Sequence, residues 1–323
     1  MPTQATVRIT PSLGISVTPT CQLSCVYCPP HGENIVACER LCAVGPILGL
    51  LEAFAEAGGR VVRLTGGEPL LEPTRTRELL VHAVQLAFPK IILNTNGVCL
   101  RKELSWLRDL GRRFECKVSL DTLVPSEYER LTGRNLCAEV MRGVQTAIEG
   151  GLCVTINIMY TRHNASSVLD VLHFCEELGC DAKIFDVYDF GGVFPERWED
   201  SYANLDPFLH LLEKKYQKSD PERLPGGRGI EMTSFKIGES NRLLVVNHHG
   251  ARRGTRLFAP SCMSCGRYPC GGGRFHLALR SDGLLCPCRL RPDLGLSIED
   301  CEPQKVASVL AKQLADFYSC WYG

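Results

Sequence analysis

Between residue 12 and about residue 190, short apolar runs alternate with longer stretches in which apolar residues recur every three or four positions. The short runs are rich in Val, Ile and Leu, which is typical of strands buried in a parallel sheet. The longer stretches have helical spacing, and two of them end at glycine pairs, where helices commonly stop. The predicted strands are Gly14–Thr18, Val61–Thr65, Lys90–Asn94, Cys116–Leu120, Val154–Met159 and Ala182–Val187. The predicted helices are Gly45–Ala57, Arg77–Leu86, Glu103–Leu110, Ala138–Glu149 and Ser166–Leu178.

This order of elements predicts an α/β fold, namely a partial (β/α)6 TIM-like barrel. Strands that are separated by helices pair in parallel through right-handed crossovers. Parallel barrels place their chemistry at the C-terminal ends of the strands. Polar or glycine-rich segments follow those ends here: Cys21–Cys28, Gly66–Pro69, Asn94–Gly97, and the pair Ser119 and Asp121.

The character of the chain changes after about residue 192, where Pro, Gly and charged residues become more frequent. This part has one predicted helix, two short predicted strands around a second group of cysteines, and a last helix. These elements are Pro207–Lys215, Arg242–Val246, Phe275–Arg280 and Gln304–Tyr318. We therefore expect an N-terminal extension (1–11), a barrel core (12–192) and a C-terminal cysteine-rich region (193–323).

Composition narrows the class of protein. The chain has 323 residues, 45% of them hydrophobic, which is enough for a large core. Lys and Arg together number 36, as do Asp and Glu, so no nucleic acid or membrane partner is expected. Without a signal peptide or an apolar run of membrane-spanning length, we expect a cytoplasmic location. Metal ligation then explains the clustered cysteines better than disulfides do. The scattered Cys99, Cys116, Cys153, Cys175 and Cys180 are expected to be reduced core residues.

The cysteines with the spacing Cys21-x3-Cys25-x2-Cys28 follow the first predicted strand. Thiolates are soft ligands that bind zinc or iron–sulfur clusters. Zinc sites usually have four ligands in two close pairs, whereas three thiolates leave one iron of a 4Fe–4S cluster open to another molecule. His31 is a candidate fourth ligand, although Pro29-Pro30 makes the chain stiff before it. A structural zinc site is the alternative.

The Cys21–Cys28 motif, followed by Leu64-Thr-Gly-Gly-Glu-Pro69, resembles the radical S-adenosylmethionine (SAM) superfamily. The likeness extends over nearly the whole chain for one branch, the molybdenum-cofactor GTP 3′,8-cyclases. Further shared stretches are Ser16–Thr18, Thr95–Gly97, Val118–Asp121, Leu131–Arg134 and Leu224–Gly227. The resemblance implies an enzyme in which a cluster-bound SAM is cleaved reductively to a 5′-deoxyadenosyl radical that abstracts hydrogen from a substrate.

The resemblance also implies which residues contact SAM. The backbone of Gly66 and Gly67 would approach the methionine amino group, which small residues permit. Tyr27 would lie by the adenine, and Ser119 and Asp121 would make polar contacts. Glu68 is expected to orient the cofactor loop. Flavodoxin or ferredoxin is the expected electron donor.

A second group of thiols has the spacing Cys262-x2-Cys265-x4-Cys270, with Cys286-Pro-Cys288 beyond it. The resemblance aligns Cys262, Cys265 and Cys288 with the ligands of an auxiliary 4Fe–4S cluster, whose open iron contacts the substrate in the cyclases. An insertion here adds Cys270. If Cys270 or Cys286 is a fourth ligand, the cluster is structural or carries electrons. Either thiol is alternatively a hydrogen-atom donor to a product radical, and a four-thiolate zinc site is a further alternative.

Departures from the cyclase pattern bear on the substrate. The cyclases hold a triphosphate with arginines and a lysine, and Arg63 matches one of them. Uncharged or weakly basic residues stand at four other such positions: Gly14, Thr155, His276 and Ala278. Each lost contact would cost about 1.5–3 kcal/mol, so GTP is not the predicted substrate. We expect a nucleoside, nucleotide or sugar-like molecule, contacted by Arg63, Thr95, Lys183 and His276.

Three other interpretations stay open at this point. One is a divergent GTP 3′,8-cyclase of molybdenum cofactor synthesis. Another is a radical SAM maturase that modifies a peptide, because cysteine-rich C-terminal regions with auxiliary clusters occur in such enzymes. The third is a metal-stabilised binding module without catalysis, which would hold zinc instead of iron.

Overall fold

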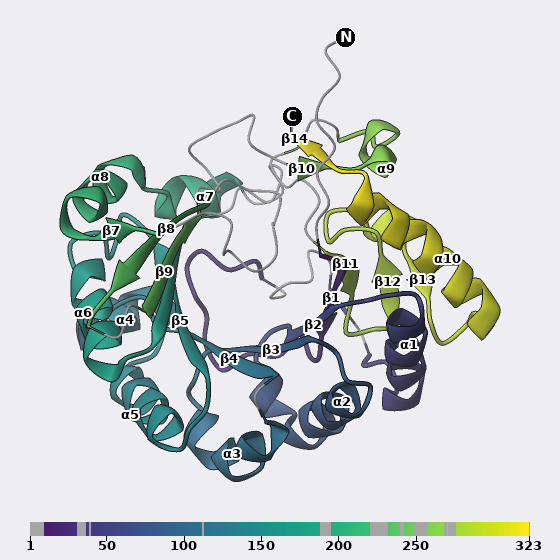
Figure 1. Ribbon diagram of the computed structural model, residues 1–323, viewed down its shortest axis with the longest axis horizontal. Coiled ribbons are helices and arrows are strands. Elements are labelled where there is room, and N and C mark those ends of the chain that lie inside the picture. Colours follow the sequence, from purple (N-terminus) through teal and green to yellow (C-terminus); the bar gives the residue numbers. More distant parts are fainter. Residues whose placement is uncertain are drawn as a thin grey trace.

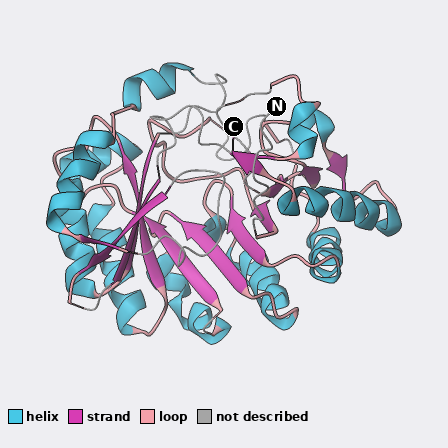
Figure 2. Ribbon diagram, turned by 45° about the horizontal axis from the view of Figure 1, so that its top comes forward, coloured by secondary structure: helices cyan, strands magenta, loops and turns pink. Residues whose placement is uncertain are grey.

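The computed structural model describes residues 10–30, 37–38, 40–111, 113–187, 195–219, 232–239, 242–247, 257–267, 270 and 276–322. In this part of the chain, a 12-stranded sheet curves into a partial barrel with helices on its outer side (Figures 1 and 2). The strand order is β13-β12-β11-β1-β2-β3-β4-β5-β6-β9-β8-β7. None of the described helices is long and apolar enough to cross a bilayer.

The centre of the sheet is formed by parallel strands in sequence order. They are β1 (Ser12–Ser16), β2 (Val61–Thr65), β3 (Lys90–Thr95), β4 (Phe114–Ser119), β5 (Val154–Tyr160) and β6 (Asp181–Asp186). The helices between them are α1 (Val44–Glu56), α2 (Pro73–Gln85), α3 (Leu100–Leu107), α4 (Pro125–Thr132), α5 (Cys137–Glu149) and α6 (Val168–Leu178). This arrangement confirms the predicted fold class.

Alternation along the strands separates the apolar outer side of the barrel from its polar interior. Successive side chains of a strand point to opposite faces. On β2, Val62 and Leu64 are completely buried within the hydrophobic core, whereas Arg63 between them lines the central cavity. The strands are in register, so that Gly14 pairs with Arg63, and Asn157 pairs with Lys183. Polar side chains from neighbouring strands therefore meet inside the barrel.

The C-terminal part of the chain extends this sheet at both edges. Beside β1 lie β11 (Leu277–Leu279), β12 (Leu284–Cys286) and β13 (Leu296–Ser297). Beside β6 lie β9 (Arg242–Asn247), β8 (Met232–Ile237) and β7 (Gln217–Lys218). The remaining elements are α7 (Pro195–Ser201), α8 (Asp206–Lys215), β10 (Leu257–Phe258), α9 (Pro260–Met263), α10 (Pro303–Ala315) and β14 (Trp321–Tyr322). The sheet thus continues past the expected boundary at 192/193, and the division into three regions stays a prediction.

Some sequence expectations need correction. The short helices α4 and α7 were not expected, because each has eight residues or fewer and little apolar periodicity. Cys153 is exposed and Cys99 is half-buried, so the expectation of five core cysteines holds for Cys116, Cys175 and Cys180 alone. Both of the other two lie beside strand or helix ends, where an apolar neighbourhood in sequence does not guarantee burial. His31 and the stretch Leu224–Gly227 lie outside the described residues.

Candidate active site

A cavity of about 360 Å³ lies inside the barrel, beside the C-terminal ends of the strands. The structure brings twelve of the eighteen expected site residues to it. Its lining includes Cys21, Cys25, Cys28, Tyr27, Arg63, Gly66, Gly67, Thr95, Ser119, Asp121, Lys183 and His276. The three cysteines of the first motif, the expected substrate contacts and the expected SAM contacts other than Glu68 therefore share one space.

The loop that carries the three cysteines is anchored to the end of α4. The backbone N–H of Ser24 donates to the carbonyl of Thr132 at 2.8 Å, and that of Val26 to the carbonyl of Leu131 at 2.9 Å. These carbonyls belong to the last turn of the helix, where no intrahelical donor is available. Gly133 then ends α4 in the left-handed conformation, with a φ of 78°. The helix end thus fixes the backbone of the cysteine loop.

A second anchor is Arg197 on α7. Its terminal Nη1 donates to the carbonyl of Cys28 at 2.7 Å and lies 3.3 and 3.5 Å from the carbonyls of Val26 and Cys25. These carbonyls follow the same turn of the loop, so one guanidinium holds them together. Arg197 thereby connects the cysteine loop to a helix that lies after the barrel core in the sequence.

The sulfur of Cys21 accepts two hydrogen bonds from the protein. The backbone N–H of Leu23 lies 3.4 Å from it, and the side-chain amide of Asn96 lies 3.5 Å from it. Asn96 is held in place by the amide of Gln22, at 3.1 Å. N–H donors around a thiolate stabilise its charge, which suits a cluster ligand.

Gly66 and Gly67 pack directly on the backbone that leads into the cysteine loop. Gly66 has a φ of +135°, and a Cβ there would lie 2.4 Å from the carbonyl oxygen of Thr18. A Cβ on Gly67 would lie 2.2 Å from the carbonyl oxygen of Thr20. The N–H of Gly67 donates to Thr18 at 2.7 Å. Only glycine fits this contact, which sets the position of the loop at the cavity wall.

Glu68 does not line the cavity but lies beneath it, with no exposed surface. Its carboxylate accepts hydrogen bonds from the backbone N–H of Leu70 at 2.9 Å, the hydroxyl of Thr95 at 2.7 Å and the N–H of Asn96 at 2.7 Å. Burial raises the pKa of Glu68 to about 7. Glu68 therefore connects the loops after β2 and β3. The hydroxyl of Thr95 is occupied by this contact, and its expected substrate role stays a prediction.

Tyr27 and Asp121 form a pair across the cavity wall. The phenol of Tyr27 donates to one carboxylate oxygen of Asp121 at 2.5 Å, and the N–H of Met159 donates to the other at 2.7 Å. Burial raises the pKa of Asp121 to about 6. Asp121 thus fixes the ring of Tyr27 between the cysteine loop and the ends of β4 and β5.

Basic side chains from several strands line the interior of the same cavity. They are Arg63, Lys117, Lys183, His276 and Arg289. Lys117 forms an ion pair with Glu115 at 3.0 Å, and Glu115 also pairs with Lys90 at 2.8 Å. Although burial alone would raise it, Lys117 and Lys90 hold the pKa of Glu115 well below its usual range. Lys117 is thus paired within the protein, and Arg63, Lys183, His276 and Arg289 make up the rest of the basic lining.

Gly14 and His276, which we expect to replace two basic residues of the cyclase pattern, lie close together. A Cβ on Gly14 would lie 2.7 Å from Cδ2 and 2.8 Å from Nε2 of His276. A side chain at position 14 and the imidazole in its present place thus exclude each other. The expected departures at these two positions are therefore linked sterically. Thr155, a third departure, donates its hydroxyl to Glu115 at 2.6 Å.

The family model of the radical SAM superfamily matches residues 15–175. The chain is 30% identical over 292 residues to the GTP 3′,8-cyclase of Rhodopseudomonas palustris. This alignment covers 87% of this chain and 80% of that protein. The chain belongs to the radical SAM superfamily. The probable GTP 3′,8-cyclase of Methanococcus aeolicus is 28% identical over 292 residues, covering 87% of this chain and 86% of that protein. The expected resemblance is confirmed, and the chain is an enzyme.

Solved structures of radical SAM proteins have the same fold. The chain matches anSMEcpe with bound AdoMet at a TM-score of 0.60 and 15% identity, covering 95% of this chain and 82% of that one. It matches Streptococcus suis SuiB bound to the precursor peptide SuiA at a TM-score of 0.61 and 16% identity, covering 88% of this chain. The match spans only 61% of SuiB. At these identities the likeness establishes the partial barrel and nothing further.

Radical SAM enzymes use SAM and a 4Fe–4S cluster, and the cavity fits both groups. Three thiols on one anchored loop face it, which is the donor set that leaves one iron open. Among the described residues, no three or more His, Cys, Asp or Glu side chains lie close enough together to hold a single metal ion. The assignment of the cluster therefore rests on which cysteines line the cavity.

A second cavity of about 270 Å³ lies in the C-terminal part of this radical SAM enzyme. Its lining includes four of the five expected thiols: Cys262, Cys265, Cys270 and Cys288. The fifth, Cys286, lines neither of these two cavities and is only 1% exposed. The auxiliary cluster, and the role of Cys270 or Cys286 as a hydrogen-atom donor, stay predictions.

Sequence reasoning missed several residues of the site. Lys117 could have been predicted, because it lies two residues before Ser119 and therefore on the same face of the strand. Arg289 follows Cys288 directly, but nothing in the sequence aims it at the barrel. Arg197 acts through contacts with the distant cysteine loop, and no local pattern indicates such contacts. Asn96 belongs to the expected Asn94–Gly97 segment, but its contact with Cys21 was not expected.

Proposed function

We propose that this enzyme cleaves SAM at a 4Fe–4S cluster held by Cys21, Cys25 and Cys28 and abstracts hydrogen from a small molecule. The molecule would be nucleoside-, nucleotide- or sugar-like, with fewer negative charges than GTP. The observation that supports this most is the single cavity that joins the cysteine loop to the basic barrel interior. When bound, the cluster and SAM supply the 5′-deoxyadenosyl radical, and the protein supplies orientation and exclusion of water.

The residues around the cysteine loop divide this task. Gly66 and Gly67 leave backbone at the wall without side chains, where the methionine part of SAM would lie. Tyr27, held by Asp121, would face the adenine. Ser119 lines the cavity between these groups and the barrel interior. These residues would hold SAM in the same cavity as the basic side chains of the barrel interior.

The basic interior supports an anionic substrate, and its geometry supports a smaller charge than a triphosphate. Arg63 of β2 and Lys183 of β6 line the cavity. His276 fills the space beside Gly14, where an arginine side chain would otherwise extend. Hydrogen bonds to charged groups contribute about 1.5–3 kcal/mol each, so the loss of such contacts weakens triphosphate binding strongly. One phosphate or carboxylate would suit the remaining set.

A GTP 3′,8-cyclase activity is the second candidate, because the curated relatives at 28–30% identity carry that name. A peptide substrate has less support, since the likeness to SuiB concerns the fold alone. An auxiliary cluster in the second cavity, and flavodoxin or ferredoxin as electron donor, complete the proposal.

Anaerobic incubation of reconstituted, dithionite-reduced enzyme with SAM, with and without GTP, tests both candidates by mass spectrometry. We expect 5′-deoxyadenosine to form while GTP is recovered unchanged. A Cys25→Ala variant is the control and should form none. A cyclised product from GTP would establish the second candidate instead. If no 5′-deoxyadenosine forms in protein with about eight irons per chain, so that both clusters are assembled, the radical chemistry itself would be refuted.

A further inference from the structure

The five thiols that were expected to compete for the auxiliary cluster do not lie in one place. Four of them line the second cavity: Cys262 on α9, Cys265 just after it, Cys270, and Cys288 beyond β12. They come from separate stretches of the chain that converge on one space. A set of four thiols around one space is the usual ligand set of a 4Fe–4S cluster.

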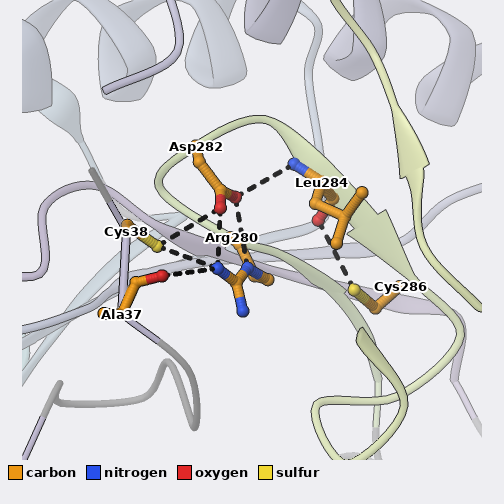
Figure 3. A network of polar contacts seen from close by, with 6 residues as sticks. All are labelled: Ala37, Cys38, Arg280, Asp282, Leu284 and Cys286. Atoms are coloured by element: carbon orange, nitrogen blue, oxygen red, sulfur yellow. Dashed lines mark hydrogen bonds and ion pairs between the residues drawn. The ribbon is translucent and has the colours of Figure 1, made fainter. Parts of the chain in front are cut away.

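Cys286 has a different environment, although only Pro287 separates it from Cys288 in the sequence. It ends β12, pairs with Ala278 of β11, and donates its thiol to the carbonyl of Leu284 at 3.6 Å. Figure 3 shows it on the strand beside Arg280. Arg280 forms an ion pair with Asp282 at 2.6 Å and also contacts the sulfur of Cys38 at 3.2 Å (Figure 3). Cys286 thus belongs to the sheet, between β11 and β13, and not to the second cavity.

The second cavity also has walls that suit a cluster. Apolar side chains form part of its surface: Phe258, Pro287, Leu290 and Leu294. Arg291 donates to the sulfur of Cys265 at 2.8 Å and is held by Asp293 at 2.7 Å. Hydrogen bonds to ligand sulfurs and apolar walls are the means by which proteins stabilise and tune iron–sulfur clusters.

We propose that Cys262, Cys265, Cys270 and Cys288 together bind the auxiliary 4Fe–4S cluster, so that every iron has a thiolate ligand from the protein. This rests on the proposed function, which assigns an auxiliary cluster to this cavity. Cys270 closes the position that three ligands alone would leave open. The substrate therefore does not bind to this cluster's iron, and its recognition belongs to the barrel cavity. The auxiliary cluster is left with a structural or electron-carrying role.

The test isolates the auxiliary cluster in the full-length chain. The parent variant carries Cys21→Ala, Cys25→Ala and Cys28→Ala, so that only the second cavity can assemble a cluster. Cys270→Ala and Cys286→Ala are then each added to it. Iron and sulfide content and the EPR spectrum of the reduced cluster are measured with and without cyanide, a ligand for an open iron.

We expect about four irons per chain in the parent and an EPR spectrum that cyanide does not change. The Cys286→Ala protein should behave identically. The Cys270→Ala protein should respond to cyanide and lose one iron on mild oxidation. If the Cys270→Ala protein holds no cluster at all, Cys270→Ser should restore a cluster with an altered EPR spectrum, because the serine oxygen can also bind iron. A cyanide response in the parent, or the response appearing with Cys286→Ala instead, would overturn the assignment.

Failure of the underlying proposal gives a different result. Zinc, or no metal, in the parent would show that the second cavity holds no iron–sulfur cluster. A Cys262→Ala, Cys265→Ala, Cys288→Ala variant would then still contain about four irons at the barrel cavity. That combination would refute the auxiliary cluster and leave the SAM-cleaving site unaffected.

Discussion

Glu68 shows how a single buried residue supports the site without entering it. Its carboxylate joins the loop after β2 to the loop after β3 through Leu70, Thr95 and Asn96. Asn96 in turn contacts the sulfur of Cys21. A change at Glu68 would thus reach the cysteine loop through one intermediate residue.

The protonation of Glu68 should make stability depend on pH. Burial raises its pKa from 4.5 to about 7, so the folded protein binds this proton more tightly than the unfolded chain does. The resulting stabilisation is fully present below the unfolded pKa and is lost as the pH rises through about 7. The difference corresponds to roughly 3 kcal/mol, because one pKa unit is about 1.4 kcal/mol.

A Glu68→Gln variant tests this expectation by thermal unfolding between about pH 5 and about pH 8. Gln is uncharged at every pH and should flatten the profile, although losing one acceptor lowers stability at all pH values. Asp121, whose pKa is also raised, titrates in both proteins and cancels in the difference. Parallel profiles for the two proteins would show that Glu68 does not titrate in this range.

At the residue scale, the sequence alone predicted the members of the barrel cavity better than their contacts. Motif spacing and strand ends identified the three cysteines, Ser119 and Asp121, because these signals are local. The contact between Gly14 and His276 joins residues near opposite ends of the chain. No periodicity encodes such a contact, which appears only when β11 pairs with β1.

At the scale of elements, two short helices hold the cysteine loop. The end of α4 accepts two of its backbone N–H groups, and Arg197 of α7 donates to its carbonyls. The six central strands, β1 to β6, were predictable because each is a short apolar run bounded by turns. The two short helices were not, because their role lies in end groups and one side chain, which leave no apolar stripe.

Replacing Arg197 by Met should loosen the cysteine loop while keeping the size of the side chain similar. Each loop carbonyl left without a donor typically destabilises the protein by about 1–3 kcal/mol, so we expect faster loss of the cluster. Chelator-resistant iron over time, measured anaerobically, reports this loss. Arg162→Met is the matched control, because Arg162 donates to the carbonyl of Tyr202, away from the loop. Equal rates of iron loss in both variants would contradict the role of Arg197.

At the scale of the whole molecule, the C-terminal part closes off both edges of the barrel sheet. β11 pairs with β1 and β9 pairs with β6, so neither edge of the core barrel is exposed. The last helix, α10, packs on α1 and buries Val306, Leu310 and Leu314. An unpaired, apolar edge strand is a template for aggregation. The barrel core therefore depends on residues that follow it in the sequence.

A chain that ends after Val187 should consequently aggregate, because β1 and β6 would lose their outer partners and α1 its cover. Size-exclusion chromatography with light scattering measures this directly. Co-expression of residues 195–323 as a separate chain is the control. It should restore a soluble complex, since it supplies β9, β11 and α10 again. A truncated chain that is monomeric and unfolds cooperatively alone would show instead that the barrel is an independent domain, as the division at 192/193 first suggested.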